Sequence, residues 1–201
     1  MLFLISCNND NSLIATKKSM ANENEINLST TIPDENISSF KERRVIAEDI
    51  LIRVNDIIIT KELPETVEKY KINYFDESCD ENGTFNEEYQ YVFLDLIIEN
   101  KSDITKEIYL NSMLLSHIDD NNSFRGPTEE MRYRSGYNFE GISPKDYFYE
   151  VLEAYEIVDV TVGFIVQADF FDIQNSCLRI NISGNTANCS EIKSIRLTGE
   201  E

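Results

Sequence analysis

An acidic segment that precedes Tyr89 holds residues whose types and spacing could bind a metal. Ser78, Asp80, Asn82 and Gly83 fall at positions 1, 3, 5 and 6 of a calcium-loop spacing, in which oxygen ligands alternate and a glycine permits a sharp turn. The match fails at position 1, which is Ser rather than Asp, and at position 12, where Tyr89 replaces the bidentate Glu. We favour an acidic loop between strands, and a Ca²⁺ site formed by Ser78, Asp80 and Asn82 is the alternative.

A locally basic, aromatic stretch is the second candidate site. It contains Arg132, Tyr133, Arg134 and Tyr137 within an otherwise acidic chain. Exposed Tyr and Arg are enriched at binding hot spots, so this stretch could contact a partner. The favoured alternative is a strand whose Tyr side chains pack on a sheet.

Catalytic motifs are missing from the sequence. His117 is the single histidine and would have to serve as the base of any Ser/His/Asp arrangement, but no G-x-S-x-G surrounds a serine. There is also no G-x-G-x-x-G, Walker loop or H-E-x-x-H. We therefore expect a protein that is not an enzyme and has no cofactor. A carboxylate-based hydrolase is the less favoured alternative, and it requires a deep pocket with two carboxylates.

The net charge of −19 restricts the partners. Such a surface repels phosphate backbones, so no nucleic-acid partner is expected. It also disfavours an anionic membrane surface unless the chain is tethered. We interpret the charge mainly as a source of solubility and expect an unknown protein or surface ligand as the partner.

The four cysteines do not form a zinc motif, because none occurs as CxxC. A hairpin turn near Thr186 would place Cys177 opposite residues around Ile195 rather than opposite Cys189. Cys79 could reach either of the other two, and the sequence leaves the pairing open. One disulfide is favoured if the protein is exported, and free buried thiols are the alternative.

The segments that must position these residues are strands. Period-2 alternation and β-branched or aromatic residues predict strands with polar turns between them. The expected strands are Ile50–Ile59, Tyr89–Glu99, Ile108–Leu110, Met113–Ile118, Tyr147–Leu152, Val158–Val166, Leu178–Ile182 and Ile192–Leu197. About seven short strands without a long helical stripe predict an all-β fold, an antiparallel β-sandwich.

The first 44 residues differ in composition from the rest. Residues 8–44 are rich in Asn, Ser, Thr and Glu and lack sustained periodicity, which predicts a disordered stalk before a folded domain over residues 45–201. The stretch Leu4-Ile5-Ser6-Cys7 resembles the lipobox of bacterial lipoproteins. This resemblance implies a lipid on Cys7, which would be the only membrane contact, at the extracellular face of a bacterial cell membrane. No Lys or Arg precedes Cys7, so we expect the signal peptide to be truncated here.

The strand and turn at residues 91–102 resemble the "v-D-v-x-I-x-N-k-s" motif of secreted bacterial immunoglobulin-like domains, often called telokin-like. Leu115-Ser116-His117-Ile118-Asp119 is similar to the strand that follows in that family. The resemblance covers residues 48–198 and implies an immunoglobulin-like sandwich in a lipobox-anchored family of unknown function. We therefore expect a lipid-anchored extracellular binding module, and a calcium-responsive extracellular domain is the alternative.

Overall fold

The computed structural model describes residues 31–72, 79–137, 148–181 and 191–198. Within these ranges the chain forms β-strands and short 3₁₀ helices but no α-helix. The strands are β1 (Ile37–Ser38), β2 (Arg44–Ala47), β3 (Ile50–Thr60), β4 (Tyr89–Asn100), β5 (Lys106–Tyr109), β6 (Met113–Ile118), β7 (Phe124–Arg134), β8 (Tyr149–Leu152), β9 (Ile157–Gln167), β10 (Ser176–Ile180) and β11 (Lys193–Arg196). The 3₁₀ helices are η1 (Asp34–Asn36), η2 (Lys69–Lys71), η3 (Leu110–Ser112) and η5 (Ile173–Asn175).

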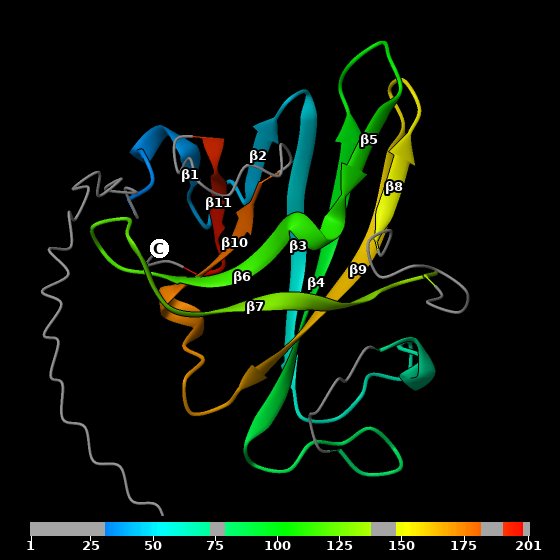
Figure 1. The fold of residues 1–201 in the computed structure, drawn as a ribbon, viewed down its shortest axis with the longest axis vertical. Helices are drawn as coiled ribbons and strands as arrows, with labels where there is room; N and C mark the ends of the chain where they lie inside the picture. The colour runs from blue at the N-terminus through cyan, green and yellow to red at the C-terminus, as the bar shows by residue number, and fades with distance from the viewer. Residues whose placement is uncertain (1–30, 73–78, 138–147, 182–190, 199–201) are drawn as a thin grey trace, which may run out of the picture.

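Nine strands form one continuous sheet that folds over itself into two layers. Its order is β1-β11-β10-β6-β7-β9-β4-β3-β2, while β5 pairs only with β8 among the described strands. β7 joins the layers, because it pairs with β6 as far as Glu130 and with β9 from Met131 onward. In Figure 1, β6 and β7 run across β3 and β4. The result is a β-sandwich in which every described pair is antiparallel except β1 with β11.

Strand β4 shows how the alternation of the sequence separates two apolar layers. Alternate residues from Val92 to Ile98 are at most 1% exposed and belong to the main core between the sheet layers. Tyr91 and Phe93 point to the opposite face, as the period of two requires. The period-2 alternation predicted for residues 89–99 is confirmed.

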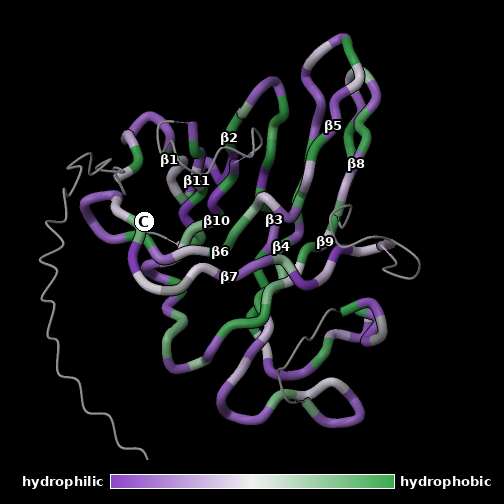
Figure 2. The backbone as a smooth tube through the Cα atoms, viewed as in Figure 1, coloured by the Kyte–Doolittle hydropathy of each residue, from purple (hydrophilic) through white to green (hydrophobic). Residues whose placement is uncertain are grey.

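The main core is mostly aliphatic and draws on both layers. It includes Ile50, Ile52, Val54, Leu94, Leu96, Val160, Val162, Phe164, Leu178, Ile180 and Ile195. In Figure 2 the hydrophobic stretches lie mostly on the strands in the middle of the molecule, and the connecting loops are largely hydrophilic.

A separate aromatic cluster covers the outer face of β4 and β9. It consists of Val67, Ile72, Phe85, Tyr91, Phe93, Tyr133 and Ile165. The ring of Tyr91 lies 4.5 Å from that of Phe85 and 5.4 Å from that of Phe93, and Tyr133 meets Phe93 edge-on at 5.8 Å. Met131, two residues before Tyr133, faces the main core instead. A register shift in β7 between these two residues sends their side chains to opposite faces, as a β-bulge does.

The ordered part of the chain begins before the predicted boundary at Val45. Ile32 is 1% exposed, and β1 pairs with β11, so the assignment of residues 31–44 to a disordered stalk is wrong. Short edge strands carry too few residues to show a period, which explains why β1 and β2 were missed. β7 was also missed as a full strand, and the strands outnumber the expected seven. No described helix has the length and hydrophobicity to cross a bilayer.

Candidate interaction surface

The segment with the calcium-loop spacing forms a hydrogen-bonded turn before β4. Ser78 lies outside the described residues, and the Asn82 side chain is exposed. One carboxylate oxygen of Asp80 accepts hydrogen bonds from the backbone N–H groups of Asn82 and Thr84, both at 2.8 Å. No group of three or more His, Cys, Asp and Glu side chains in the described part of the chain could hold a metal ion. The acidic-loop interpretation accounts for the contacts of Asp80, and Ca²⁺ binding stays a prediction.

The same turn occurs again between β6 and β7. Asp119 accepts hydrogen bonds from the backbone N–H groups of Asn121 and Ser123, both at 2.9 Å. Asn122 has a φ of 58°, and Gly83 in the first turn has a φ of 82°. The backbone N–H of Ser123 and the side chain of Arg125 hold the pKa of Asp119 below its ordinary value. A D-x-N-x-[ST] sequence is therefore a recurring structural turn in this chain.

The basic, aromatic stretch is mostly used for packing. Tyr133 is 3% exposed in the aromatic cluster, which agrees with the favoured interpretation of a Tyr that packs on a sheet and not with an exposed binding residue. The Arg134 guanidinium Nε lies 2.7 Å from the carboxylate of Glu150 on β8, and both side chains are less than one fifth exposed. Tyr137 packs against the main core, and Arg132 is half-buried. The structure thus does not gather these four residues into one exposed patch.

Two of the cysteines have free thiols in separate parts of the fold. Cys79 packs beside the aromatic cluster, whereas Cys177 is fully buried with Ile32 and Ile118, so a bridge between Cys79 and Cys177 is wrong. Burial raises the pKa of the Cys177 thiol to about 12. Cys177 lies opposite Arg196, which confirms the predicted hairpin register. Cys7 and Cys189 lie outside the described residues.

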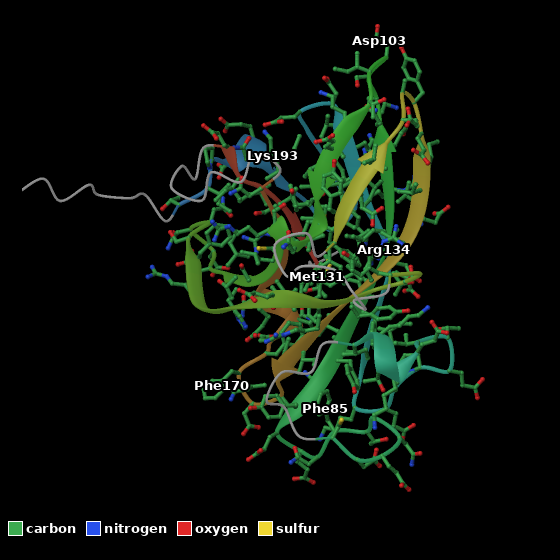
Figure 3. All side chains as sticks on the ribbon, turned by 45° about the vertical axis from the view of Figure 1, so that its right-hand side comes forward. Phe85, Asp103, Met131, Arg134, Phe170 and Lys193 are labelled. Carbon is green, nitrogen blue, oxygen red and sulfur yellow. The ribbon has the colours of Figure 1, made fainter. Side chains whose placement is uncertain are left out.

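Two loops meet at one end of the molecule and are held by a single buried side chain. Asn100, at the end of β4, is fully buried. Its amide nitrogen donates to the backbone carbonyls of Ile104, Leu152 and Glu153 at 2.7–3.2 Å. Its amide oxygen accepts from the backbone N–H and the hydroxyl of Ser102. Asn100 therefore joins the loop of residues 101–105 to the loop of residues 153–156, and Figure 3 shows Asp103 at this end.

The two-stranded sheet β5–β8 continues from these loops and has two unlike faces. Ile108 and Leu152, at most 2% exposed, point into the main core. Tyr109 and Tyr149 are cross-strand partners on the outer face, with ring centroids 5.1 Å apart. Val151 shares that face and is 46% exposed. This alternation leaves an aromatic and aliphatic surface in water.

The loops add two more exposed apolar side chains to this end. Ile104 is 59% exposed, and Tyr155 is 64% exposed with a φ of 61°. The backbone N–H of Tyr155 donates to the Ser102 carbonyl at 3.2 Å, which fixes one loop against the other. We call the surface formed by Ile104, Tyr109, Tyr149, Val151 and Tyr155 the tip surface.

Carboxylates lie within and beside the tip surface, since Glu107 is the cross-strand partner of Val151 on its outer face. The exposed acidic residues of β5, β8 and the two loops include Asp103, Glu107 and Glu153. Partial desolvation and the Glu107 carboxylate, which accepts a hydrogen bond from the Tyr149 hydroxyl, raise the pKa of Tyr149. A surface that mixes apolar and acidic side chains is complementary to one that combines apolar and basic groups.

Comparison with known proteins gives only similarities of fold. No protein-family model matches the sequence, and no curated protein matches it. The yjhA protein from Bacillus subtilis superposes with a TM-score of 0.47 at 10% identity, over 77% of this chain and 96% of that chain. An uncharacterized β-sandwich protein from Clostridium difficile 630 gives 0.39 at 7% identity, over 78% and 91%. A candidate lipoprotein, ycdA from Bacillus subtilis, gives 0.42 at 8% identity, over 80% and 39%.

Sequence reasoning missed the tip surface because its residues are distant along the chain. Tyr109 and Tyr149 are brought together only by the pairing of β5 with β8. Each strand does carry a local signal of an exposed side chain. Tyr109 follows the core residue Ile108, and Tyr149 lies close to the core residue Leu152 of its own strand. The alternation within one strand identifies an exposed aromatic side chain, but only the pairing between strands shows that several such side chains form one patch.

Proposed function

We propose that this chain is an immunoglobulin-like binding module without catalytic activity, tethered by a lipid on Cys7 to the outer face of a bacterial membrane. The tip surface binds a protein that presents basic and apolar groups together. The observation that carries the proposal is the exposure of Tyr109 and Tyr155, with the half-buried Tyr149 beside Tyr109, on one pair of strands and its loops.

Two physical arguments support a binding role for the tip surface. Exposed Tyr and aliphatic side chains do not contribute the free energy of burial in the free chain. A partner that covers them gains roughly 25 cal/mol for each Å² of apolar surface removed from water. The buried Asn100 holds both loops before any partner arrives, which reduces the conformational entropy lost on binding. The carboxylates within and beside the tip surface would speed association with a basic partner and make it sensitive to salt.

Covalent crosslinking on intact cells that express the full chain tests the proposal. The test variant is Tyr109→Ala combined with Tyr155→Asn, because Asn tolerates the positive φ that Tyr155 adopts. Phe170→Ala is the matched control. Phe170 is 66% exposed and lies toward the opposite end of the molecule from Asp103 (Figure 3).

We expect a basic protein that crosslinks to the wild-type chain and to Phe170→Ala but not to the double variant. The Cys7→Ala chain should leave the membrane fraction and lose the same partner if that partner is on the cell surface. Equal crosslinking of the double variant would refute the tip surface as the binding site. Membrane retention of Cys7→Ala would refute the lipid tether and leave the tip surface to be judged on purified protein.

A further inference from the structure

The two edges of the nine-stranded sheet come together without pairing. β1 and β2 stand at opposite ends of the strand order, and no described residue of β1 pairs with β2. The backbone N–H of Arg44 on β2 nevertheless donates to the Ser38 hydroxyl on β1 at 3.2 Å. Figure 1 shows β1, β11 and β2 side by side in the same part of the molecule. The sheet is thus nearly closed into a barrel, with a seam between β1 and β2.

An open groove of about 480 Å³ lies along this seam. Ile37, Val45, Ile46 and Leu51 line it with apolar surface. This volume is in the range of sites that bind small molecules or short peptide segments. We call it the seam groove.

One edge of the seam groove presents backbone groups that none of the described strands uses. The two-residue turn between Ala47 and Ile50 makes these residues a hydrogen-bonded pair, and the ladder continues through Val45 with Ile52. The N–H of Val54 donates to the Arg43 carbonyl at 2.8 Å, which agrees with this alternation.

The residues between those pairs, Arg44 and Ile46, therefore direct their N–H and C=O groups away from β3. Ser38 accepts the N–H of Arg44, whereas the N–H and C=O of Ile46 face the seam groove. The Ile46 side chain is 56% exposed. This edge has the geometry that an extended peptide recognises when it adds a strand to a sheet.

The charges of the seam groove differ from those of the chain as a whole. Its lining contains the cations Arg44, Lys101 and Lys193 and the two carboxylates Glu35 and Glu42, although the chain carries a net charge of −19. Figure 3 shows Lys193 on this side of the molecule.

The three cations of the seam groove differ in the ion pairs and hydrogen bonds that they form within the described structure. Lys101 pairs with Glu99 at 2.9 Å, and Lys193 donates to the side-chain oxygen of Asn36. The Arg44 side chain is exposed and forms no ion pair among the described residues. The guanidinium of Arg44 is therefore the group at this edge that favours a carboxylate.

We propose that the seam groove binds an extended peptide segment with acidic side chains, which adds a strand along the free edge of β2. The peptide backbone bonds to the N–H and C=O of Ile46, its apolar side chains cover Ile37 and Leu51, and a carboxylate meets Arg44. This binding site uses other strands than the tip surface and does not depend on the proposed function.

Titration of the ¹⁵N-labelled full chain carrying Cys7→Ser with defined peptides tests the proposal by NMR. The probe is an N-acetylated hexapeptide of alternating Val and Glu. One control peptide replaces Glu by Lys, and a second places Pro in the middle of the Val–Glu peptide to remove a backbone donor. We expect saturable shifts of the Ile46 and Ser38 amide signals with the Val–Glu peptide, and at least tenfold weaker binding of both controls.

Two variants separate backbone pairing from charge. Ile46→Pro removes the outward N–H but none of the β2–β3 hydrogen bonds, and an edge strand tolerates Pro at such a position. This variant should weaken peptide binding at least tenfold. Arg44→Glu should reverse the preference between the Glu and Lys peptides, and it provides the test if Ile46→Pro fails to fold. No saturable shift up to millimolar peptide would overturn the proposal. So would shifts confined to other strands, or equal binding of the Glu and Lys peptides to the wild-type chain.

Discussion

The two ends of β4 use aromatic residues in opposite ways. Near its start, Tyr91 and Phe93 are at most 2% exposed, because residues before the strand pack over them. Beyond its end, Tyr155 is 64% exposed, and the loops there are held by the polar contacts of Asn100 rather than by apolar packing. One end gains stability from burial, while the other keeps apolar groups in water on a rigid support.

The difference shows that a region of the chain can be held rigid without burying its aromatic side chains. Aromatic rings in contact contribute about 0.5–1.5 kcal/mol beyond their area, and the buried end has a chain of such contacts. A buried amide with all its donors and acceptors satisfied costs little and fixes several loop carbonyls at once. A surface proposed to bind a partner needs the second arrangement, because burying its aromatic rings within the chain would keep them from any partner.

The largest effect should come from breaking the aromatic cluster. Phe93→Ala removes a ring that contacts both Tyr91 and Tyr133, and the cost should be about 3–5 kcal/mol in the free energy of unfolding. Urea denaturation followed by circular dichroism measures it. Leu94→Ala, which points to the main core, is the matched comparison, with an expected cost of about 2–5 kcal/mol. A loss below 1 kcal/mol for Phe93→Ala alone would mean that the cluster is not part of the cooperative unit.

The next effect tests the polar support at the other end. Asn100→Ala removes the buried amide donor that the carbonyls of Ile104, Leu152 and Glu153 share, and we expect a loss of about 2–3 kcal/mol. Asn100→Asp keeps the shape but removes the amide donors, so it should be at least as destabilising. Hydrogen exchange should rise first in residues 101–105 and 153–156. Uniform acceleration across all strands would contradict a local role.

A smaller effect is expected from crowding the aromatic cluster. A Cβ atom on Gly163 would lie 2.7 Å from a ring carbon of Phe93 and 3.1 Å from the Cβ of Tyr133. Gly163→Ala should therefore cost about 1–2 kcal/mol through overpacking. The double variant with Phe93→Leu should recover part of this loss in a thermal melt, because the smaller side chain makes room. Purely additive losses would argue against the clash.

The smallest effect concerns pH near the tip. Burial raises the pKa of Glu150 above 4.5, although Arg134 opposes this shift. The Glu150 carboxyl therefore binds its proton more tightly in the folded protein than in the unfolded chain. The stability gained from this difference is fully present below pH 4.5 and is lost as the pH rises through the folded pKa. Relative to Glu150→Gln, the wild-type chain should lose stability in urea titrations as the pH rises from 4.5 through the raised pKa of the folded Glu150 carboxyl. A difference between the two chains that does not change with pH would contradict the shift.

Much of the strand content and of the main core follows from the sequence alone. Alternation identified β4, β6, β9 and β10 and both faces of β4, because a half-buried strand must expose every second residue. The Asn100-Lys101-Ser102 turn was also visible in the sequence, and the structure gives its physical reason in the hydrogen bonds between Asn100 and Ser102.

Only the tertiary structure decided which aromatic residues are buried and where the edges of the sheet lie. Tyr133 is buried because a bulge in β7 turns it away from the face that Met131 occupies, and local sequence does not specify a bulge. Tyr109 and Tyr149 meet through a pairing between segments that are distant in the chain. The seam groove exists because the first and last strands of the sheet order approach each other. A local period fixes the direction of a side chain, but long-range pairing decides what covers it.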